Sequence, residues 1–120
     1  GAIPLPCPGL MELVEQEANE QARRYLLELL HPYDLRKVDA VVLGCTHYVF
    51  LRPLLREILP ENVQVLDGNE GTARQLRRVL TENDLLCARE TPGKITLETS
   101  GAPETVLPVM QRRLVRADTL

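Results

Sequence analysis

A short apolar run that ends in a Cys-Thr-His tripeptide constrains the fold of this chain more than any other feature. Residues 40–44 are apolar or small, rich in valine and of strand length, and a helix-like pattern begins at Tyr48. A buried strand that leads into a helix is typical of an α/β sheet, in which ligands bind at the carboxyl ends of the strands. We therefore expect Cys45, Thr46 and His47 to lie at the mouth of a site.

The rest of the chain alternates helical and strand-like segments. Apolar residues at helical spacing predict helices at about residues 10–30, 48–59, 71–80 and 103–114. Apolar runs predict strands at residues 38–43, 63–66 and 94–99, the last from the alternation of Ile95 and Leu97. This order predicts an α/β fold with a parallel sheet, although about three strands make a thin sheet to stand alone.

Composition narrows the class of protein. The 120 residues are 44% apolar and 26% charged, which is typical of one globular domain or of part of a larger one. A formal net charge of −3 argues against a nucleic-acid partner, and no apolar run approaches the roughly 20 residues that span a membrane. No signal peptide is visible, so the three cysteines are interpreted as reduced thiols in the cytoplasm. Their spacing predicts no metal site.

Cys45 and His47 allow two interpretations. Backbone N–H groups at the start of a helix favour the thiolate form of a neighbouring cysteine, and His47 is near enough in sequence to exchange a proton with it. Thr46 offers a hydroxyl and an N–H group to a substrate carboxylate. Alternatively, Cys45 is a small buried apolar residue and His47 a helix cap. The spacing alone does not decide between them.

Four stretches resemble glutamate racemases, which belong to the aspartate/glutamate racemase superfamily. The hexapeptide Leu-Gly-Cys-Thr-His-Tyr at residues 43–48 is similar to the signature around a catalytic cysteine of that family, and it is the most specific of the four. The supporting stretches are Cys-Pro at residues 7–8 with Leu-Val-Glu at residues 13–15, residues 66–73, and residues 99–104.

The resemblance implies a cofactor-independent interconversion of L- and D-glutamate by two opposed thiols, with neither a cofactor nor a metal. Cys45 would be one of the two acid/base thiols, and His47 and Glu15 would assist it. Thr46 and His47 would bind the substrate. Such an isomerase would work in the cytoplasm and supply D-glutamate for peptidoglycan biosynthesis, and hence for cell wall biogenesis and cell shape.

The resemblance covers only the C-terminal half of such an enzyme. The Asp-Ser, Pro-Tyr-Gly and Ala-Cys-Asn-Thr motifs of the N-terminal half are not in this sequence, and Val49 stands where the family usually has proline. Residues 1–61 would be the latter part of the second racemase domain, and residues 62–120 a C-terminal segment that returns to the first. Cys7 and Cys87 are interpreted as structural, so the isolated chain is expected to be inactive.

Two other functions stay open. One is a racemase of the same superfamily that acts on aspartate or another amino acid. The other is a non-catalytic remnant that serves as an interaction module. A Cys-His hydrolase is disfavoured, because its nucleophile needs a base oriented at hydrogen-bond distance. Apolar surface left bare by absent strands is expected to promote association, for which a homodimer is one form.

Overall fold

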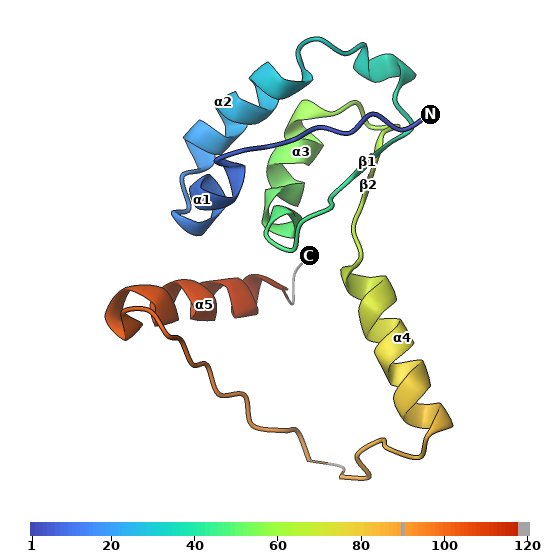
Figure 1. The fold of residues 1–120 in the computed structure, drawn as a ribbon, viewed down its shortest axis with the longest axis vertical. Helices are drawn as coiled ribbons and strands as arrows, with labels where there is room; N and C mark the ends of the chain where they lie inside the picture. Colours follow the sequence, from blue (N-terminus) through green and yellow to red (C-terminus); the bar gives the residue numbers. More distant parts are fainter. Residues whose placement is uncertain (90, 118–120) are drawn as a thin grey trace. The chain divides into compact units, whose positions relative to one another are not determined.

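The computed structural model describes residues 1–89 and 91–117, and the chain divides into two compact units, Gly1–Leu86 and Cys87–Leu120. The second unit contains the helix α5 (Pro103–Ala117). The first unit contains the remaining elements, in the chain order α1 (Leu10–Glu15), α2 (Asn19–Leu30), the 3-10 helix η1 (Leu35–Lys37), β1 (Ala40–Val42), the 3-10 helix η2 (Tyr48–Leu51), α3 (Arg52–Ile58), β2 (Gln64–Leu66) and α4 (Asn69–Glu82) (Figure 1).

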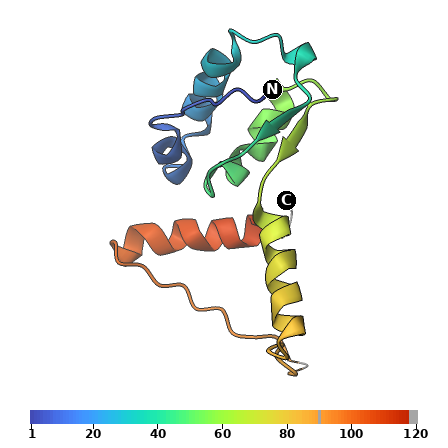
Figure 2. The ribbon, with the colours of Figure 1, turned by 45° about the vertical axis from the view of Figure 1, so that its right-hand side comes forward.

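β1 and β2 form a parallel pair, joined by a crossover that contains η2 and α3. Val41 is in register with Val65, and Val42 with Leu66. Figures 1 and 2 both show α3 between α2 and the two strands. The strands predicted at residues 38–43 and 63–66 are therefore confirmed, and the architecture is a partial α/β fold with a parallel sheet.

The hydrophobic core lies on the helical side of this sheet. Val65 is buried and Val41 packs against the core from the neighbouring strand. The next residues along each strand point the other way, and the side chains of Val42 and Leu66 are 71% and 45% exposed. Most parallel sheets are covered by helices on both faces. In the described part of this chain, the face that carries Val42 and Leu66 is left bare. The remaining core is aliphatic and comes from the helices and their flanking residues: Leu10, Val14, Ala22, Leu26, Leu30, Leu43, Leu51, Leu55, Leu59 and Val63.

The predicted helix at residues 10–30 is in fact two helices. Glu17 has a φ of 54°, in the left-handed region, which ends α1. The Glu17 N–H donates to the Val14 carbonyl at 3.1 Å, and the Ala18 N–H to the Leu13 carbonyl at 2.9 Å. This pair of bonds is a Schellman motif, which satisfies carbonyls at a helix end. α1 therefore stops just after Glu15.

The predicted helix at residues 48–59 begins as a 3-10 turn and becomes α-helical at Arg52. Pro53 lies in the first turn of α3, where its missing N–H costs no helical hydrogen bond. The predicted helix at residues 103–114 is observed as α5, which extends to Ala117.

Two expectations for the second half of the chain are wrong. Residues 94–99 form no strand, and Ile95 is 68% exposed. An alternating pattern predicts two faces, but a strand also needs a partner for its backbone groups, and the described residues offer none there. α4 is longer than the predicted 71–80, and none of its residues is buried. Apolar residues at helical spacing usually face a core, but Leu76 of this helix is 58% exposed. None of the helices in the described ranges is long and apolar enough to cross a membrane.

Candidate active site

The Cys-Thr-His tripeptide lies in the turn between β1 and η2. The Leu43 N–H extends the ladder by donating to the Leu66 carbonyl at 2.8 Å, and the chain turns directly afterwards. The turn does not require the left-handed backbone conformation that favours glycine, because Gly44 does not adopt a positive φ. The Tyr48 N–H donates to the Cys45 carbonyl at 3.1 Å, which closes the turn. The tripeptide is therefore presented at the carboxyl end of β1, as expected.

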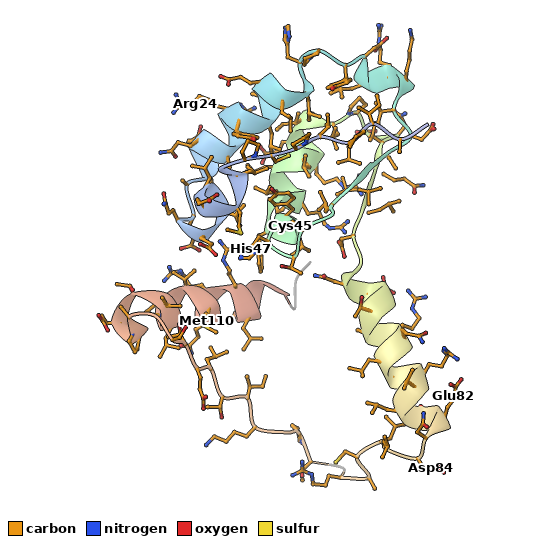
Figure 3. The ribbon with its side chains drawn as sticks, viewed as in Figure 1. Arg24, Cys45, His47, Glu82, Asp84 and Met110 are labelled. Atoms are coloured by element: carbon orange, nitrogen blue, oxygen red, sulfur yellow. The ribbon has the colours of Figure 1, made fainter. Side chains whose placement is uncertain are left out.

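Cys45, His47 and Glu15 form a chain of contacts. The Cys45 Sγ lies 3.8 Å from His47 Nδ1, and His47 Nε2 lies 3.1 Å from a carboxylate oxygen of Glu15. Figure 3 shows Cys45 and His47 beside each other in the turn. Glu15 reaches them from the last residue of α1, which the Schellman motif ends at that point. The structure thus brings together three residues that the sequence singled out, although Glu15 is distant from the other two in sequence.

The two nitrogens of the His47 ring are used differently. A carboxylate can only accept hydrogen bonds, so the hydrogen between Glu15 and His47 belongs to Nε2. In the neutral ring Nδ1 is then an acceptor that faces the Cys45 thiol. A proton that moves from the thiol to Nδ1 leaves a thiolate beside an imidazolium, and Glu15 stabilises that imidazolium. The contact between Cys45 and His47 is partly buried, whereas the side chain of Glu15 is exposed to solvent.

The other predicted residues are placed less centrally. Thr46 is exposed in the same turn. Cys7 packs against the core and donates its S–H to the Leu5 carbonyl at 3.2 Å, and burial raises the pKa of its thiol. Cys87 is exposed, and the Arg89 guanidinium, whose Nε lies 3.3 Å from the sulfur, lowers its pKa. Cys7 therefore has the expected structural character, whereas Cys87 is not a buried structural residue.

The described residues contain no group of three or more His, Cys, Asp or Glu side chains that could hold a metal ion.

Sequence reasoning assigned no role to Tyr48 or Arg52, and both brace the turn. The Tyr48 hydroxyl donates to the Cys7 carbonyl at 3.3 Å, which ties η2 to the N-terminal loop. Burial raises the pKa of Tyr48, so the hydroxyl keeps its proton as the donor of this bond. Arg52 forms an ion pair with Asp67 at the end of β2 and also donates to the Val65 carbonyl at 3.0 Å. No sequence spacing connects Arg52 with Asp67, so only the folded chain reveals this pair.

Asp67 is held in its charged form. The Asn69 N–H donates to one carboxylate oxygen at 2.9 Å, and the Arg52 guanidinium pairs with the other. These two partners lower the pKa of Asp67, because each stabilises the ionised carboxylate. The ion pair thereby fixes the start of α3 to the end of β2, close in the chain to the turn that carries Cys45.

Comparison with known proteins identifies the relatives of this fold. Residues 2–76 match the model of the Asp/Glu/Hydantoin racemase family. That segment includes Glu15 and the whole Cys-Thr-His turn.

Curated glutamate racemases are similar over almost the whole chain. The protein from Bifidobacterium animalis subsp. lactis is 43% identical over 114 residues, which are 92% of this chain and 44% of that protein. The protein from Clostridium perfringens is 37% identical over 112 residues, again 92% of this chain and 43% of that protein. This chain therefore spans less than half the length of the curated relatives that it matches.

Solved structures agree with the sequence comparison. A glutamate racemase isoform from Bacillus anthracis has a TM-score of 0.74 at 29% identity and covers 91% of this chain and 41% of its own. The glutamate racemase from Thermus thermophilus, solved in complex with Beta-chloro-D-alanine, has a TM-score of 0.72 at 31% identity and covers 89% and 41%. On the strength of the family match over residues 2–76, this chain belongs to the Asp/Glu/Hydantoin racemase family.

Proposed function

We propose that this chain supplies one half of the active site of a glutamate racemase, with Cys45 as one of two acid/base thiols. The observation that carries the proposal is the chain of contacts from Cys45 through His47 to Glu15. Glutamate is favoured over aspartate as the substrate because the curated relatives are named glutamate racemases. Aspartate or another amino acid is the alternative substrate in the same family.

The proposed reaction breaks the bond between the α-carbon and its hydrogen. The Cys45 thiolate takes the proton, an S–H bond forms, and the electron pair spreads from the α-carbon into the substrate carboxyl group. The substrate is then protonated on its opposite face by an acid from outside this chain. We propose that the reaction needs no cofactor, so positioning and fixed dipoles must stabilise the carbanionic transition state.

His47 and Glu15 are proposed to control the charge on Cys45. The imidazole accepts the thiol proton at Nδ1 and returns it, and Glu15 holds the ring in the required tautomer. Thr46 and His47 are proposed to bind polar groups of the substrate, because both lie in the turn that presents Cys45. Cys7 cannot readily serve the opposite face, since it is packed against the core.

The proposal extends to the setting of the enzyme. Residues 1–61 are proposed as the latter part of the second racemase domain, and residues 62–120 as the segment that returns to the first. The complete enzyme is proposed to be a cytoplasmic homodimer that provides D-glutamate for peptidoglycan, and hence for the cell wall and cell shape. A net charge of −3 does not favour binding to the negatively charged phosphates of nucleic acids. This supports a small molecule, and not a nucleic acid, as the binding partner.

A chimera tests the proposed function. This chain replaces the matched segment of the Bifidobacterium animalis glutamate racemase, and circular dichroism follows the optical activity of glutamate. We expect racemisation in the chimera, a loss of at least about a thousandfold with Cys45→Ser, and little change with the matched control Cys87→Ser. The isolated chain should be inactive, and aspartate in the same assay measures specificity.

A folded chimera that racemises glutamate equally well with Cys45→Ser would contradict the proposal, and one that racemises neither substrate would favour a non-catalytic interaction module.

A further inference from the structure

Two consecutive residues, His47 and Tyr48, contact opposite ends of α1. His47 Nε2 lies 3.1 Å from the carboxylate of Glu15, the last residue of the helix. At the other end, the Tyr48 hydroxyl donates to the Cys7 carbonyl at 3.3 Å. The N–H of Leu10, the first residue of the helix, donates to the same carbonyl at 3.3 Å. The Cys-Thr-His turn is therefore joined to α1 at both ends.

These two contacts differ in their exposure to water. The side chains of His47 and Glu15 are 35% and 56% exposed, so solvent competes for the contact between them. The bond from Tyr48 to Cys7 is partly buried, and both residues pack against the hydrophobic core. A hydrogen bond with less access to water is electrostatically stronger. The bond at the start of α1 is therefore better suited to fix the position of the helix.

α1 is too short to hold that position by itself. It has six residues, which make fewer than two turns, and isolated helices of this length are marginal in water. Leu10 and Val14 bury one face of the helix, but hydrophobic burial is not directional. A hydrogen bond is directional and can prevent a shift along the helix axis. Such a shift would move Glu15 away from His47.

We propose that Tyr48 is a positioning residue for the Cys45 thiol and acts through α1. Its hydroxyl fixes the start of the helix, and the helix carries Glu15 to His47. The imidazole then faces the Cys45 thiol with Nδ1. The consequence for racemisation rests on the proposed function, whereas the effect on the thiol is a property of this chain alone.

Tyr48→Phe isolates the contribution of the hydroxyl. The aromatic ring stays, and the Cys7 carbonyl keeps the bond from Leu10, so the carbonyl is not left without a partner. The fold should therefore survive, which the urea midpoint checks. Tyr25→Phe is the matched control, because Tyr25 also packs against the core but lies on α2.

Alkylation of Cys45 by iodoacetamide in the full chain tests the inference. Cys7 and Cys87 are replaced by serine, and Cys7→Ser keeps the backbone carbonyl to which Tyr48 donates. At pH 7 we expect Tyr48→Phe to slow the reaction at least about threefold. Tyr25→Phe should leave the rate unchanged. Unfolding would expose the partly buried thiol, so it would not produce a slower reaction.

A double-mutant cycle shows whether Tyr48 acts through Glu15. In a Glu15→Gln background, Tyr48→Phe should have no further effect, because the carboxylate that it positions is already absent. An unchanged rate with Tyr48→Phe, or equal slowing in both backgrounds, would overturn the inference. Loss of the fold with Tyr48→Phe would make the hydroxyl a structural group and would overturn it as well.

The chimera with the Bifidobacterium animalis racemase separates this inference from the proposed function. There Tyr48→Phe should lower kcat at least about twofold and leave the KM for glutamate unchanged, since the hydroxyl is not proposed to bind the substrate. An active chimera without coupling between Tyr48 and Glu15 would contradict the positioning role alone. Coupling in the isolated chain together with an inactive chimera would support the positioning role and contradict the proposed function.

Discussion

His47 contacts a thiol through one ring nitrogen and a carboxylate through the other, so the imidazole connects Glu15 with Cys45. Cys45 and His47 were identifiable from sequence because they share one turn. Glu15 depended on the resemblance, since Glu12 is on the same helix. The contact with His47 now distinguishes Glu15 from its neighbour.

Alkylation of Cys45 measures this arrangement in the isolated chain. With Cys7 and Cys87 replaced by serine, we expect His47→Gln to slow the reaction of Cys45 with iodoacetamide at pH 7 by roughly tenfold, because the thiol loses its proton acceptor. Glu15→Gln should slow it less. Glu12→Gln is the matched control and should react at the original rate. Equal rates for all variants would show that the contacts do not activate the thiol.

Asp67 should make the stability of the first unit depend on pH. The pKa of Asp67 in the folded chain is below its unfolded value of about 3.9. Its contribution to stability is therefore complete above that value and is lost as the pH falls through the folded pKa. We expect Asp67→Asn to lower the urea midpoint at pH 6 and to flatten the decline in acid.

Asp34 provides the comparison for Asp67. Its pKa is also lowered, first by a hydrogen bond from Arg36, but its basic partners are exposed. Solvent screens such pairs, so Asp34→Asn should change the urea midpoint less. A larger effect from Asp34→Asn would contradict the bracing role of Arg52 and Asp67.

At the scale of elements, the end of α1 depends on a left-handed Glu17. A residue with a side chain pays about 1 kcal/mol or more in that conformation, and glycine avoids the cost. We expect Glu17→Gly to raise the free energy of unfolding by about 0.5–1 kcal/mol in urea denaturation. Glu12→Gly, at a regular position of the same helix, should lower it by about 1 kcal/mol. A loss of stability with Glu17→Gly would mean that its side-chain interactions outweigh the backbone cost.

The elements that could be predicted from sequence are those whose apolar residues face the core. The runs that became β1 and β2 are apolar because they face a core, and their positions were confirmed. Residues 94–99 show a weaker apolar pattern, with alternating apolar residues. Such alternation does not specify which strand the segment would pair with. The break at Glu17 escaped prediction because no glycine marks it. The arginines of α3 escaped prediction because helical spacing does not reveal which carbonyls they will reach.

At the scale of the whole molecule, stability depends on a small aliphatic core. The side chain of Leu55 is 2% exposed and that of Leu66 is 45% exposed. We expect Leu55→Ala to lower the free energy of unfolding by about 2–5 kcal/mol, because it removes buried methyl groups and leaves a cavity. Leu66→Ala, on the bare face, should change it by about 0.5 kcal/mol or less. Urea denaturation followed by circular dichroism measures both, and similar losses would place the core elsewhere.

The arginine pair on β2 also limits how far this chain can polymerise. Fibrous stacking requires every added unit to present a new open edge to the next. In the described part of the chain, Arg52 and Arg56 hold outward carbonyls of β2, at Val65 and Val63, whereas the outer edge of β1 has no such side-chain bonds. Two copies that meet edge to edge through β1 would leave exposed only the β2 edges, whose outward carbonyls the arginines already hold. Association of this kind should stop at a dimer and should not continue into a fibril.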